Sequence, residues 1–408
     1  MIEMQGCFVE NRMAMMDHDI IIIGAGPAGL SFARAMAETD LSILLIEKQP
    51  ESVIADPPYD GREIALTHLS HKIMNDLGMW DLVDDEHISL IKTAKVMNGH
   101  SPYALSFDHT EVGEENLGFM ISNHRIRRAA YEAVKDYPNV TFMNEVTVSK
   151  VDTDDDKGWV ELSDGKRLEA PLIIAADSRF SNTRRMMGIA TNMLDFGRTC
   201  IVCTMEHELP HDDTAYECFH YDRTVAVLPL NNGQVSVVMT LTSEEDAEVL
   251  GMDEQDFSDD VAQRIEYKFG NLKLSSKRHP YPLVSTLAKT FCANRFGLIG
   301  DAAVGMHPVT AHGFNLGLRG AQSLANEIKE TLQSDGSFAP NIALERYSRK
   351  HRRHCLPLYH GTNALVRLYA VSNYRSAKFA RKALLRLGNH IRPAKKFIMN
   401  QLTETKDI

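Results

Sequence analysis

Residues 20–29 read IIIIGAGPAG and carry the strongest structural signal in the chain. Four consecutive isoleucines are typical of a strand buried on both faces, and the glycine-rich turn after them is typical of a strand that leads into a helix. In the pattern Gly-x-Gly-x-x-Gly, the first glycine permits a tight turn, the second lets a pyrophosphate approach the backbone, and the third lets helix and strand pack closely. These positions are Gly24, Gly26 and Gly29, with Ala28 before the last glycine. We therefore predict a dinucleotide-binding βαβ unit.

Residues 41–49, LSILLIEKQ, fit the second strand of this unit, and Glu47 and Lys48 stand near its end. Glu47 follows Gly24 by 23 positions, which is the spacing at which such folds place a ribose-binding acid. A carboxylate there accepts hydrogen bonds from both ribose hydroxyls and repels a 2′-phosphate. We therefore expect a nucleotide without a 2′-phosphate.

Residues 300–318, GDAAVGMHPVTAHGFNLGL, form a second candidate site far along the chain. The apolar residues before it predict a buried strand that ends at Asp301, and parallel sheets bind ligands at the carboxyl ends of their strands. Asp301 is suited to bind the sugar-alcohol chain that joins an isoalloxazine ring to its pyrophosphate, a chain that NAD lacks. After Pro308, a predicted helix begins with its positive dipole end toward such a ring, at Gly313, Phe314 and Asn315.

The composition is that of a globular protein with more than one structural unit. The chain has 408 residues, of which 44% are hydrophobic, and no run approaches the roughly 18 apolar residues of a membrane-spanning helix. The first residues lack the apolar run of a signal peptide, so we expect a cytoplasmic protein. Cys200 and Cys203 form a CxxC pair, but their neighbours predict a strand, in which positions i and i+3 face opposite ways. We therefore predict buried thiols and no metal site.

Hydrophobic patterns outline the rest of the fold. Helical spacing covers four segments, which are residues 63–77, 121–137, 242–270 and 313–333. Strand patterns cover three more, which are residues 141–151, 158–170 and 171–178, and strands also dominate between 190 and 285. These patterns predict an α/β nucleotide-binding domain that a β-rich segment interrupts, followed by C-terminal helices.

Four stretches together resemble one protein family. They occur in the order seen in the class A flavoprotein monooxygenases, and they are GAGPAG, GREIALTHLS (61–70), AADSRFSNTRR (175–185) and GDAAVGMHPVTAHGFNLGL. The ubiquinone-biosynthesis hydroxylases are the most similar branch. Within that branch, PPYDGREIALTHLS, TAYECFHYDRTVAVLPL and HPVTAHGFNLGL look most like the UbiM type. The resemblance extends from about residue 17 to residue 403.

The resemblance implies a fold like that of p-hydroxybenzoate hydroxylase, in which a β-sheet substrate domain is inserted into a Rossmann-type FAD domain. It assigns residues 17–75, 110–187 and 286–335 to the FAD domain, and residues 76–109 and 188–285 to the substrate domain. Residues 336–408 then form a C-terminal basic helical region.

By position, the resemblance implies a set of FAD-binding residues: Gly24, Gly26, Ala28, Gly29, Glu47, Lys48, Arg62, Asn123, Asp177, Asp301, Pro308, Gly313, Phe314 and Asn315. In this family, the arginine lies near the phosphates and the ring, and the residue matching Asn123 faces the pyrophosphate. No second glycine fingerprint follows, so NADPH or NADH is expected to dock transiently as the electron donor.

Two departures from the family pattern concern the site. Ser178 replaces the glycine of the family's Asp-Gly pair, which weakens the motif's proposed role in closing over NAD(P)H. His312 replaces a glutamine beside the flavin; a histidine there can titrate near neutral pH and act on a phenol proton, or it can simply pack. His220 is the second catalytic candidate. Its aromatic neighbours form either a substrate pocket or sheet core, and the substrate candidates are Tyr216, Phe219 and Pro229.

We therefore expect an FAD-dependent aromatic-ring hydroxylase that inserts one oxygen atom of O2 into a polyprenyl phenol or benzoquinol of ubiquinone biosynthesis. The favoured substrate is 5-demethoxyubiquinol. Three alternatives remain: a hydroxylase of a small soluble aromatic such as a salicylate, a flavin-dependent prenyl reductase, and a non-catalytic flavoprotein subunit of a quinone-synthesis complex.

The net charge of −11 is unevenly distributed, because residues 346–402 contain 14 Lys and Arg and no Asp or Glu. A helical wheel over residues 375–392 separates an apolar face from a basic face that includes Arg381, with Leu385 as the exception. Such a helix either binds the anionic inner face of a membrane, at about 1 kcal/mol per Lys or Arg, or packs on the acidic body. Other ubiquinone-biosynthesis proteins are further candidate partners. We expect no nucleic acid, because the body is acidic and no recognition module is present.

Overall fold

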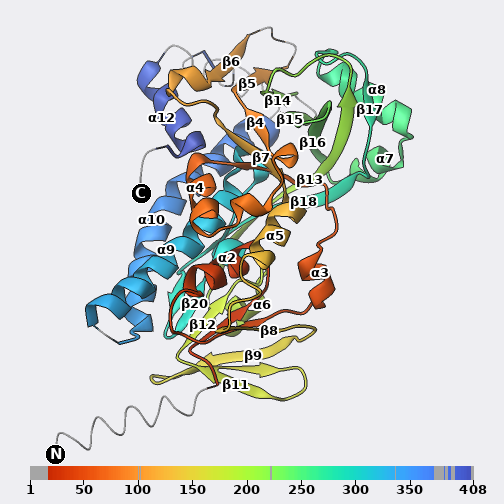
Figure 1. Ribbon diagram of the computed structural model, residues 1–408. Helices are drawn as coiled ribbons and strands as arrows, with labels where there is room; N and C mark the ends of the chain where they lie inside the picture. Colours follow the sequence, from red (N-terminus) through yellow and green to blue (C-terminus); the bar gives the residue numbers. More distant parts are fainter. Residues whose placement is uncertain are drawn as a thin grey trace, which may run out of the picture.

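The computed structural model describes residues 17–99, 101, 103–220, 223–335, 337–371, 381, 385–386 and 391–405. Its strands form a six-stranded sheet, a nine-stranded sheet and two three-stranded sheets. In Figure 1, the long helices α9 (His312–Asp335) and α10 (Pro340–Val366) run along one side of the molecule. The nine-stranded sheet lies beyond the carboxyl-terminal edge of the six-stranded sheet.

The six-stranded sheet contains the predicted βαβ unit. Its strand order is β19-β20-β12-β1-β2-β8, and all neighbours are parallel except β19. The strands are β1 (Ile20–Ile23), β2 (Ile43–Ile46), β8 (Val140–Met143), β12 (Leu172–Ala175), β19 (Cys292–Ala293) and β20 (Phe296–Leu298). Every residue of β1, β2 and β12 is buried, since helices cover both faces of a parallel sheet. Helix α2 (Pro27–Met36) leaves β1 and packs on α9 and on α5 (Asn123–Glu132).

The nine-stranded sheet has the order β21-β18-β13-β16-β15-β14-β5-β6, with β17 paired to β13. Its strands are β5 (Thr93–Asn98), β6 (Ala104–Asp108), β13 (Thr191–His207), β14 (Thr214–Phe219), β15 (Thr224–Pro229), β16 (Gln234–Thr242), β17 (Leu272–Leu274), β18 (His279–Ala288) and β21 (Val304–Gly305). Helices α7 (Asp246–Gly251) and α8 (Glu254–Arg264) lie on one side of it (Figure 1). We call the side under α7 and α8 the outer face, and the opposite side the inner face.

The long strand β13 is bent in its first half. Its register with β18 shifts between Asp195 and Thr199, which marks a β-bulge. Gly197, inside the bulge, has φ of +61°, a value that favours glycine. Before the bulge, β13 pairs with the C-terminal half of β18, which also contacts β21. After the bulge, β13 pairs with the first residues of β18, His279–Pro282.

The two small sheets flank the large ones. One consists of β9 (Val148–Thr153), β10 (Gly158–Leu162) and β11 (Arg167–Ala170), and the other of β3 (Glu63–Leu66), β7 (Gly118–Ser122) and β4 (Ser89–Ile91). The prediction of a continuous helix over residues 63–77 is therefore wrong in its first half. Residues 63–66 pair with β7, and helix α4 (His68–Asp76) begins only after Thr67, whose hydroxyl accepts from the Ser70 N–H as its N-cap.

The structure confirms the predicted α/β fold with a β-rich insertion and C-terminal helices. It also shows that the CxxC pair lies on a strand, with the two thiols on opposite faces. Cys203 belongs to the outer-face core with Val261 of α8, whereas Cys200 packs with Val202 and Leu283 on the inner face. The assignment of residue ranges to an FAD domain and a substrate domain stays a prediction.

The C-terminal region continues from α10 through a π-helical turn (Arg367–Val371) to α12 (Arg392–Thr403). Most of the predicted helix over residues 375–392 lies outside the described residues. Within the part that is described, Arg381 and Leu385 are both buried, and the Arg381 Nε donates to the Leu368 carbonyl at 2.7 Å. At Arg381 the basic face of the wheel is therefore packed against protein, which fits the alternative that this helix packs on the body. In the described part of the chain, no helix is long and apolar enough to cross a bilayer.

Candidate active site

The glycine turn after β1 has the geometry of a phosphate cradle. Gly24 has φ of +107°, and a Cβ there would lie 2.6 Å from the Ala176 carbonyl oxygen. A Cβ on Gly29 would lie 2.0 Å from the Gly24 oxygen, so helix and turn touch backbone to backbone. At Gly26, by contrast, an added Cβ meets nothing within 4 Å. The N-terminus of α2 carries no side-chain cap, so its N–H groups remain available to an anion.

Glu47 stands where the second strand ends and reaches back to this turn. Its carboxylate accepts from the Ala25 N–H at 2.7 Å and from the Gln49 N–H at 3.0 Å. These two bonds hold the carboxylate beside the glycine turn, in the position of a ribose-binding acid. Lys48 is exposed next to it.

The second candidate stretch meets the first at the same sheet edge. Gly300 has φ of +58°, and a Cβ there would lie 2.7 Å from the Ala28 Cβ. Asp301 follows in a short 3-10 turn after β20 and accepts from Arg179 Nη2 at 3.1 Å and Nε at 3.3 Å. The two distant stretches of sequence therefore form one site, because β1 and β20 both end at this edge.

A charged group on the loop before β3 was missed by sequence reasoning. Asp60 accepts from Arg62 Nη2 at 2.5 Å and from Asn123 Nδ2 at 2.8 Å, so it joins the two predicted FAD-binding side chains. Burial opposes ionisation of Asp60, but the hydrogen bonds from Arg62 and Asn123 lower its pKa. The inner face touches this loop, since the Tyr281 hydroxyl donates to the Asp60 carbonyl at 2.6 Å.

Arg127 is a second residue that sequence reasoning missed. It lies one helical turn beyond Asn123 on α5, and burial lowers its pKa while the charges of Asp60, Arg62 and Glu47 act on it. Among the described residues, no hydrogen bond or ion pair satisfies its guanidinium. The signal was present in the sequence, because positions i and i+4 of a helix face the same way.

Asp177 and Ser178 form a strained corner after β12. The Asp177 carboxylate accepts from the Ser181 hydroxyl at 2.5 Å and from the Thr183 N–H at 3.0 Å. Ser178 is exposed and has φ of +77°, in the left-handed region that the family's glycine occupies without strain. The backbone at Ser178 therefore adopts a conformation that suits glycine, although the residue here is serine.

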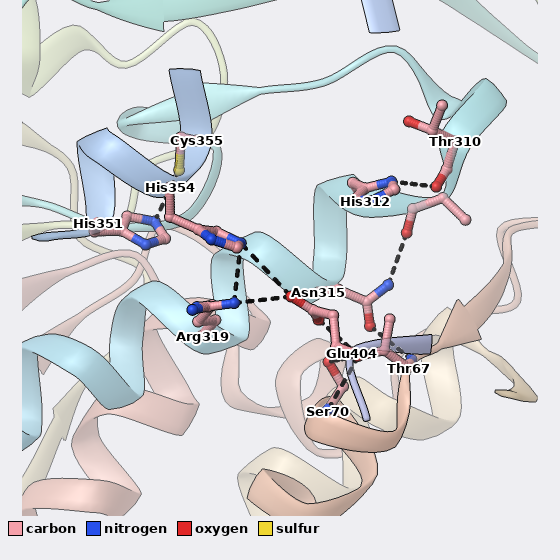
Figure 2. A network of polar contacts seen from close by, with 11 residues as sticks. Thr67, Ser70, Thr310, His312, Asn315, Arg319, His351, His354, Cys355 and Glu404 are labelled. Atoms are coloured by element: carbon pink, nitrogen blue, oxygen red, sulfur yellow. Dashed lines mark hydrogen bonds and ion pairs between the residues drawn. The ribbon is translucent and has the colours of Figure 1, made fainter. Parts of the chain in front are cut away.

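The loop from β21 to α9 is fixed from two sides. Pro308 starts a short 3-10 turn, and Ala311 has φ of +54° immediately before α9. The Asn315 amide donates to the carbonyls of Ala65 and Ala311 and accepts from the Thr67 N–H (Figure 2). Asn315 therefore connects this loop to β3, while Gly313 and Phe314 form the first turn of α9.

The C-terminal segment closes the network below this loop (Figure 2). The Glu404 side chain is only 8% exposed and accepts from Arg319 Nη1 at 2.9 Å and from the Thr67 hydroxyl at 2.9 Å. Its backbone lies in the left-handed region, with φ of +48°. Burial opposes its ionisation, but hydrogen bonds from His354 and Thr67 and the charge of Arg319 lower its pKa.

His312 lies in this network. Its side chain is buried, its Nδ1 contacts the Thr310 carbonyl (Figure 2), and burial lowers its pKa. These contacts fit the packing role, and the catalytic role of His312 stays a prediction. The groups that act on its charge, Glu404 and His354, belong to the C-terminal half of the chain.

The predicted substrate residues do not converge. The Tyr216 ring packs edge-on against Phe269 at 5.5 Å in the outer-face core, on the side away from the loop at Pro308. Phe219 faces inward but packs on Tyr369, with ring centroids 4.6 Å apart. His220 follows it, buried at the end of β14, and Pro229 is buried at the end of β15. Aromatic side chains three residues apart on a strand face opposite ways, which the cluster in the sequence concealed.

The inner face carries two separate apolar clusters. One contains Phe219, with Ala65 and Val309 of the nucleotide-binding side packed against it, and the other contains Cys200, Val202 and Leu283. The second cluster also reaches the nucleotide-binding side, because a Cβ on Gly61 would lie 3.1 Å from Val202. At the bulge of β13, the Phe196 ring packs against this second cluster and lies edge-on to His307, with ring centroids 4.9 Å apart. The inner face therefore opposes the loop of residues 306–311 and the loop of Asp60.

Comparison with known families and proteins agrees with this geometry. Residues 17–357 match the FAD binding domain family. The ubiquinone hydroxylase UbiM of Neisseria meningitidis is 48% identical over 389 residues, which cover 94% of this chain and 84% of that protein. The ubiquinone hydroxylase UbiL of Rhodospirillum rubrum is 29% identical over 388 residues, covering 95% and 90%. Among solved structures, p-nitrophenol 4-monooxygenase PnpA of Pseudomonas putida superposes with a TM-score of 0.76 at 16% identity, covering 96% of this chain and 99% of that one.

The glycine turn, the acidic residues at the carboxyl edge of the six-stranded sheet and these matches define the class of protein. The chain is an FAD-dependent monooxygenase with the p-hydroxybenzoate-hydroxylase fold. FAD is its cofactor. Within this class, the chain belongs to the family of ubiquinone-biosynthesis hydroxylases.

Proposed function

We propose that this protein hydroxylates the aromatic ring of a polyprenyl phenol or benzoquinol in ubiquinone biosynthesis, with 5-demethoxyubiquinol as the favoured substrate. The observation that carries the proposal is the 48% identity to a ubiquinone hydroxylase over nearly the whole chain. The apolar clusters of the inner face support it, because a prenylated ring needs an apolar surface close to the flavin. The prenyl-reductase, small-aromatic and non-catalytic alternatives have no comparable support.

The residues at the carboxyl edge fit FAD. The open cradle at Gly26 and the uncapped end of α2 suit the pyrophosphate, and Glu47 suits the ribose. Arg127 is suited to add positive charge near the phosphates, and Asp301 to bind the ribityl chain. When bound and reduced by NADH or NADPH, FAD supplies the chemistry that activates O2.

The protein then has three tasks: to orient the ring, to exclude water, and to move the ring's hydroxyl proton. The loop of residues 306–311 and the inner face would form opposite walls of the site, with apolar side chains from Val309 on one and Val202 on the other. Apolar walls exclude water and leave few groups able to accept a proton. The proposed residue ranges for the FAD and substrate domains follow this division.

We further propose that the C-terminal region contributes to partner contacts rather than to the chemistry. The burial of Arg381 and Leu385 favours packing of that region on the body, while the exposed Ile391 and Ile398 offer apolar side chains to a membrane surface or to another biosynthetic protein. A vesicle-flotation assay with anionic lipid distinguishes these two roles.

Incubation of the FAD-loaded protein with NADH or NADPH, isotopically labelled O2 and a short-chain demethoxyubiquinol tests the function. We expect one labelled oxygen atom in the quinol product. A strain without the protein should accumulate the precursor that lacks this hydroxyl group. Oxidation of the donor with no labelled quinol, together with an unchanged quinone profile, would rule out this substrate class.

A further inference from the structure

Glu217 is an acidic residue in the middle of an otherwise uncharged strand, β14, whose sequence is TAYECF. Its neighbours Tyr216 and Cys218 pack in the outer-face core. Ala215 and Phe219 pack on the inner face. Because side chains alternate along a strand, the Glu217 side chain lies on the inner face, the one that opposes the loops at Asp60 and Pro308.

The register of the sheet defines what surrounds this carboxyl. Glu217 pairs with Val96 on β5 and with Ala226 on β15. The same row continues through Val238 to Val202, which contacts the loop before Arg62. At a strand spacing of about 4.8 Å, Val202 lies about 14 Å from Glu217.

The row separates the two apolar clusters of the inner face. Val96 is packed against the cluster that includes Phe219, and Val238 and Val202 belong to the cluster of Cys200. Ala226 is buried and belongs to neither, and it has the smallest side chain of the row. Glu217 therefore stands at the boundary between two apolar surfaces, next to the shortest side chain of the row.

The carboxyl has no partner to explain its position. Among the residues that the structure describes, no hydrogen bond or ion pair reaches it, and the side chain still has partial access to solvent. Burial alone raises the pKa of Glu217 to about 8. The titratable groups that interact electrostatically with Glu217 are the thiols of Cys200 on β13 and Cys218 on β14, and burial raises the pKa of both to about 12. A lone polar group is costly on such a surface unless a ligand satisfies it.

We propose that Glu217 binds the hydroxyl group of the substrate ring and takes its proton during hydroxylation. This inference rests on the proposed function. In the step, the O–H bond of the ring hydroxyl breaks, an O–H bond forms on the Glu217 carboxylate, and the electron pair stays on the ring oxygen. The ring carbons ortho and para to that oxygen gain electron density and become better nucleophiles. After oxygen transfer, the proton on the hydroxylated carbon moves to the ring oxygen, which restores the aromatic ring and its hydroxyl group, and the carboxyl releases its proton to solvent when product leaves.

The Glu217→Gln variant of the full-length, FAD-loaded protein tests this assignment, because the amide keeps the size and hydrogen-bonding reach of the side chain but cannot take a proton. With the demethoxyubiquinol assay, we expect kcat to fall about 100-fold or more, with KM changed by less than about threefold. The wild-type kcat should rise as the pH passes about 8, since the carboxylate is the active form, and this rise should be absent from the variant. Glu206→Gln is the matched control, because Glu206 is exposed on β13 of the same sheet and pairs with Lys273 at the surface.

A second measurement separates a chemical role from a structural one. Titration of the flavin absorbance should show that wild-type protein binds the phenolic ring more tightly than its methyl ether, and that Glu217→Gln loses this preference. Wild-type kcat and pH profile in Glu217→Gln, with full FAD content, would overturn the inference. Should that variant fail to bind FAD, Glu217→Asp is informative: a retained pH-dependent rise with reduced kcat supports the assignment, and an unchanged kcat refutes it. Failure of the wild type to label the quinol would refute the proposed function instead.

Discussion

The two sides of the proposed active site satisfy their polar groups in different ways. At the carboxyl edge of the six-stranded sheet, Glu47, Asp60 and Asp301 each already accept two or more hydrogen bonds from the protein. On the inner face of the nine-stranded sheet, Glu217 stands among apolar side chains with no such partner in the described part of the chain. The first side is organised before FAD binds, whereas the second depends on the substrate to complete it.

This difference indicates where the protein separates binding from chemistry. A tightly bound cofactor needs a rigid cradle of charges and backbone N–H groups, and these groups lose little by being satisfied in advance. A group that must exchange a proton has to remain unsatisfied, with a pKa close to the pH of operation. The carboxylates of the edge are therefore suited to hold a ligand, and the isolated carboxyl of the inner face is suited to react with one.

The glycine turn offers the sharpest test of the rigid side. Gly29→Ala places a Cβ 2.0 Å from a backbone oxygen, so we expect a loss of about 3 kcal/mol in the free energy of unfolding. Gly26→Ala meets no protein atom within 4 Å, so the apoprotein should keep its stability within about 0.5 kcal/mol while the FAD dissociation constant rises about tenfold or more. Urea unfolding of the apoprotein and fluorescence titration with FAD check the pair. Equal FAD affinities in wild type and Gly26→Ala would contradict the cradle.

Glu404 tests whether the loop of residues 306–311 is held from the C-terminal side. Glu404→Gln leaves the largely buried Arg319 without its counter-charge, so we expect about 2 kcal/mol of destabilisation. Because the pKa of Glu404 is lowered in the folded state, its contribution is present above its ordinary pKa of 4.5 and is lost as the pH falls below that value. Thermal unfolding between pH 3 and pH 7, roughly the range over which a carboxyl titrates, should show this loss in the wild type and not in the variant.

The control for that experiment is the exposed pair of Arg346 with Glu330, whose atoms are 3.8 Å apart. Glu330→Gln should cost less than about 1 kcal/mol, because exposed ion pairs contribute little. A Glu404 variant that behaves like Glu330→Gln would mean that the loop is held by Asn315 alone.

Ser178 tests the strain at the Asp177 corner. Because Ser178 has φ of +77° and an exposed side chain, Ser178→Gly should stabilise the protein by about 0.5–1 kcal/mol. Ser163→Gly is a matched control at an exposed position without a positive φ, and it should destabilise by up to about 1 kcal/mol. Denaturant unfolding compares the two. A destabilised Ser178→Gly variant would show that the serine hydroxyl makes a contribution of its own.

Tyr216 should show the smallest effect, although it adjoins Glu217 in sequence. Its ring packs against Phe269 on the outer face, so Tyr216→Phe should keep the packing and change kcat/KM for hydroxylation by less than about twofold. A large loss of activity would indicate that the substrate binds at the outer face, and this would contradict the role assigned to Glu217 on the inner face.

The nucleotide-binding side was largely predictable because its signals are local. The fingerprint, the acid after β2 and the strand that ends at Asp301 are contiguous in sequence, and each fixes the backbone around it. Even there, Asp60 was missed, since its importance comes from the contact it makes between Arg62 and the distant Asn123.

The inner face was not predictable from clustering of residue types. Which side chains line the inner face depends on the register among five strands. A cluster of aromatic residues in the sequence does not reveal whether its members lie on the same face of the sheet. One usable signal was overlooked, namely a glutamate within an apolar strand. The surroundings of His312 were not predictable for a different reason: burial lowers its pKa, and the groups that oppose this shift include Glu404 and Gln401, which are far away in sequence.

The bulge in β13 also has a mechanical consequence. A two-stranded ribbon resists stretching along its hydrogen-bonded ladder but bends where the ladder is interrupted. In this protein the interruption lies between Asp195 and Thr199, with a glycine in the left-handed region inside it. The ribbon of β13 and β18 connects β21, the strand before the loop of residues 306–311, to the wall that carries Glu217. The ribbon therefore resists bending least at Gly197, which lies between these two parts of the site.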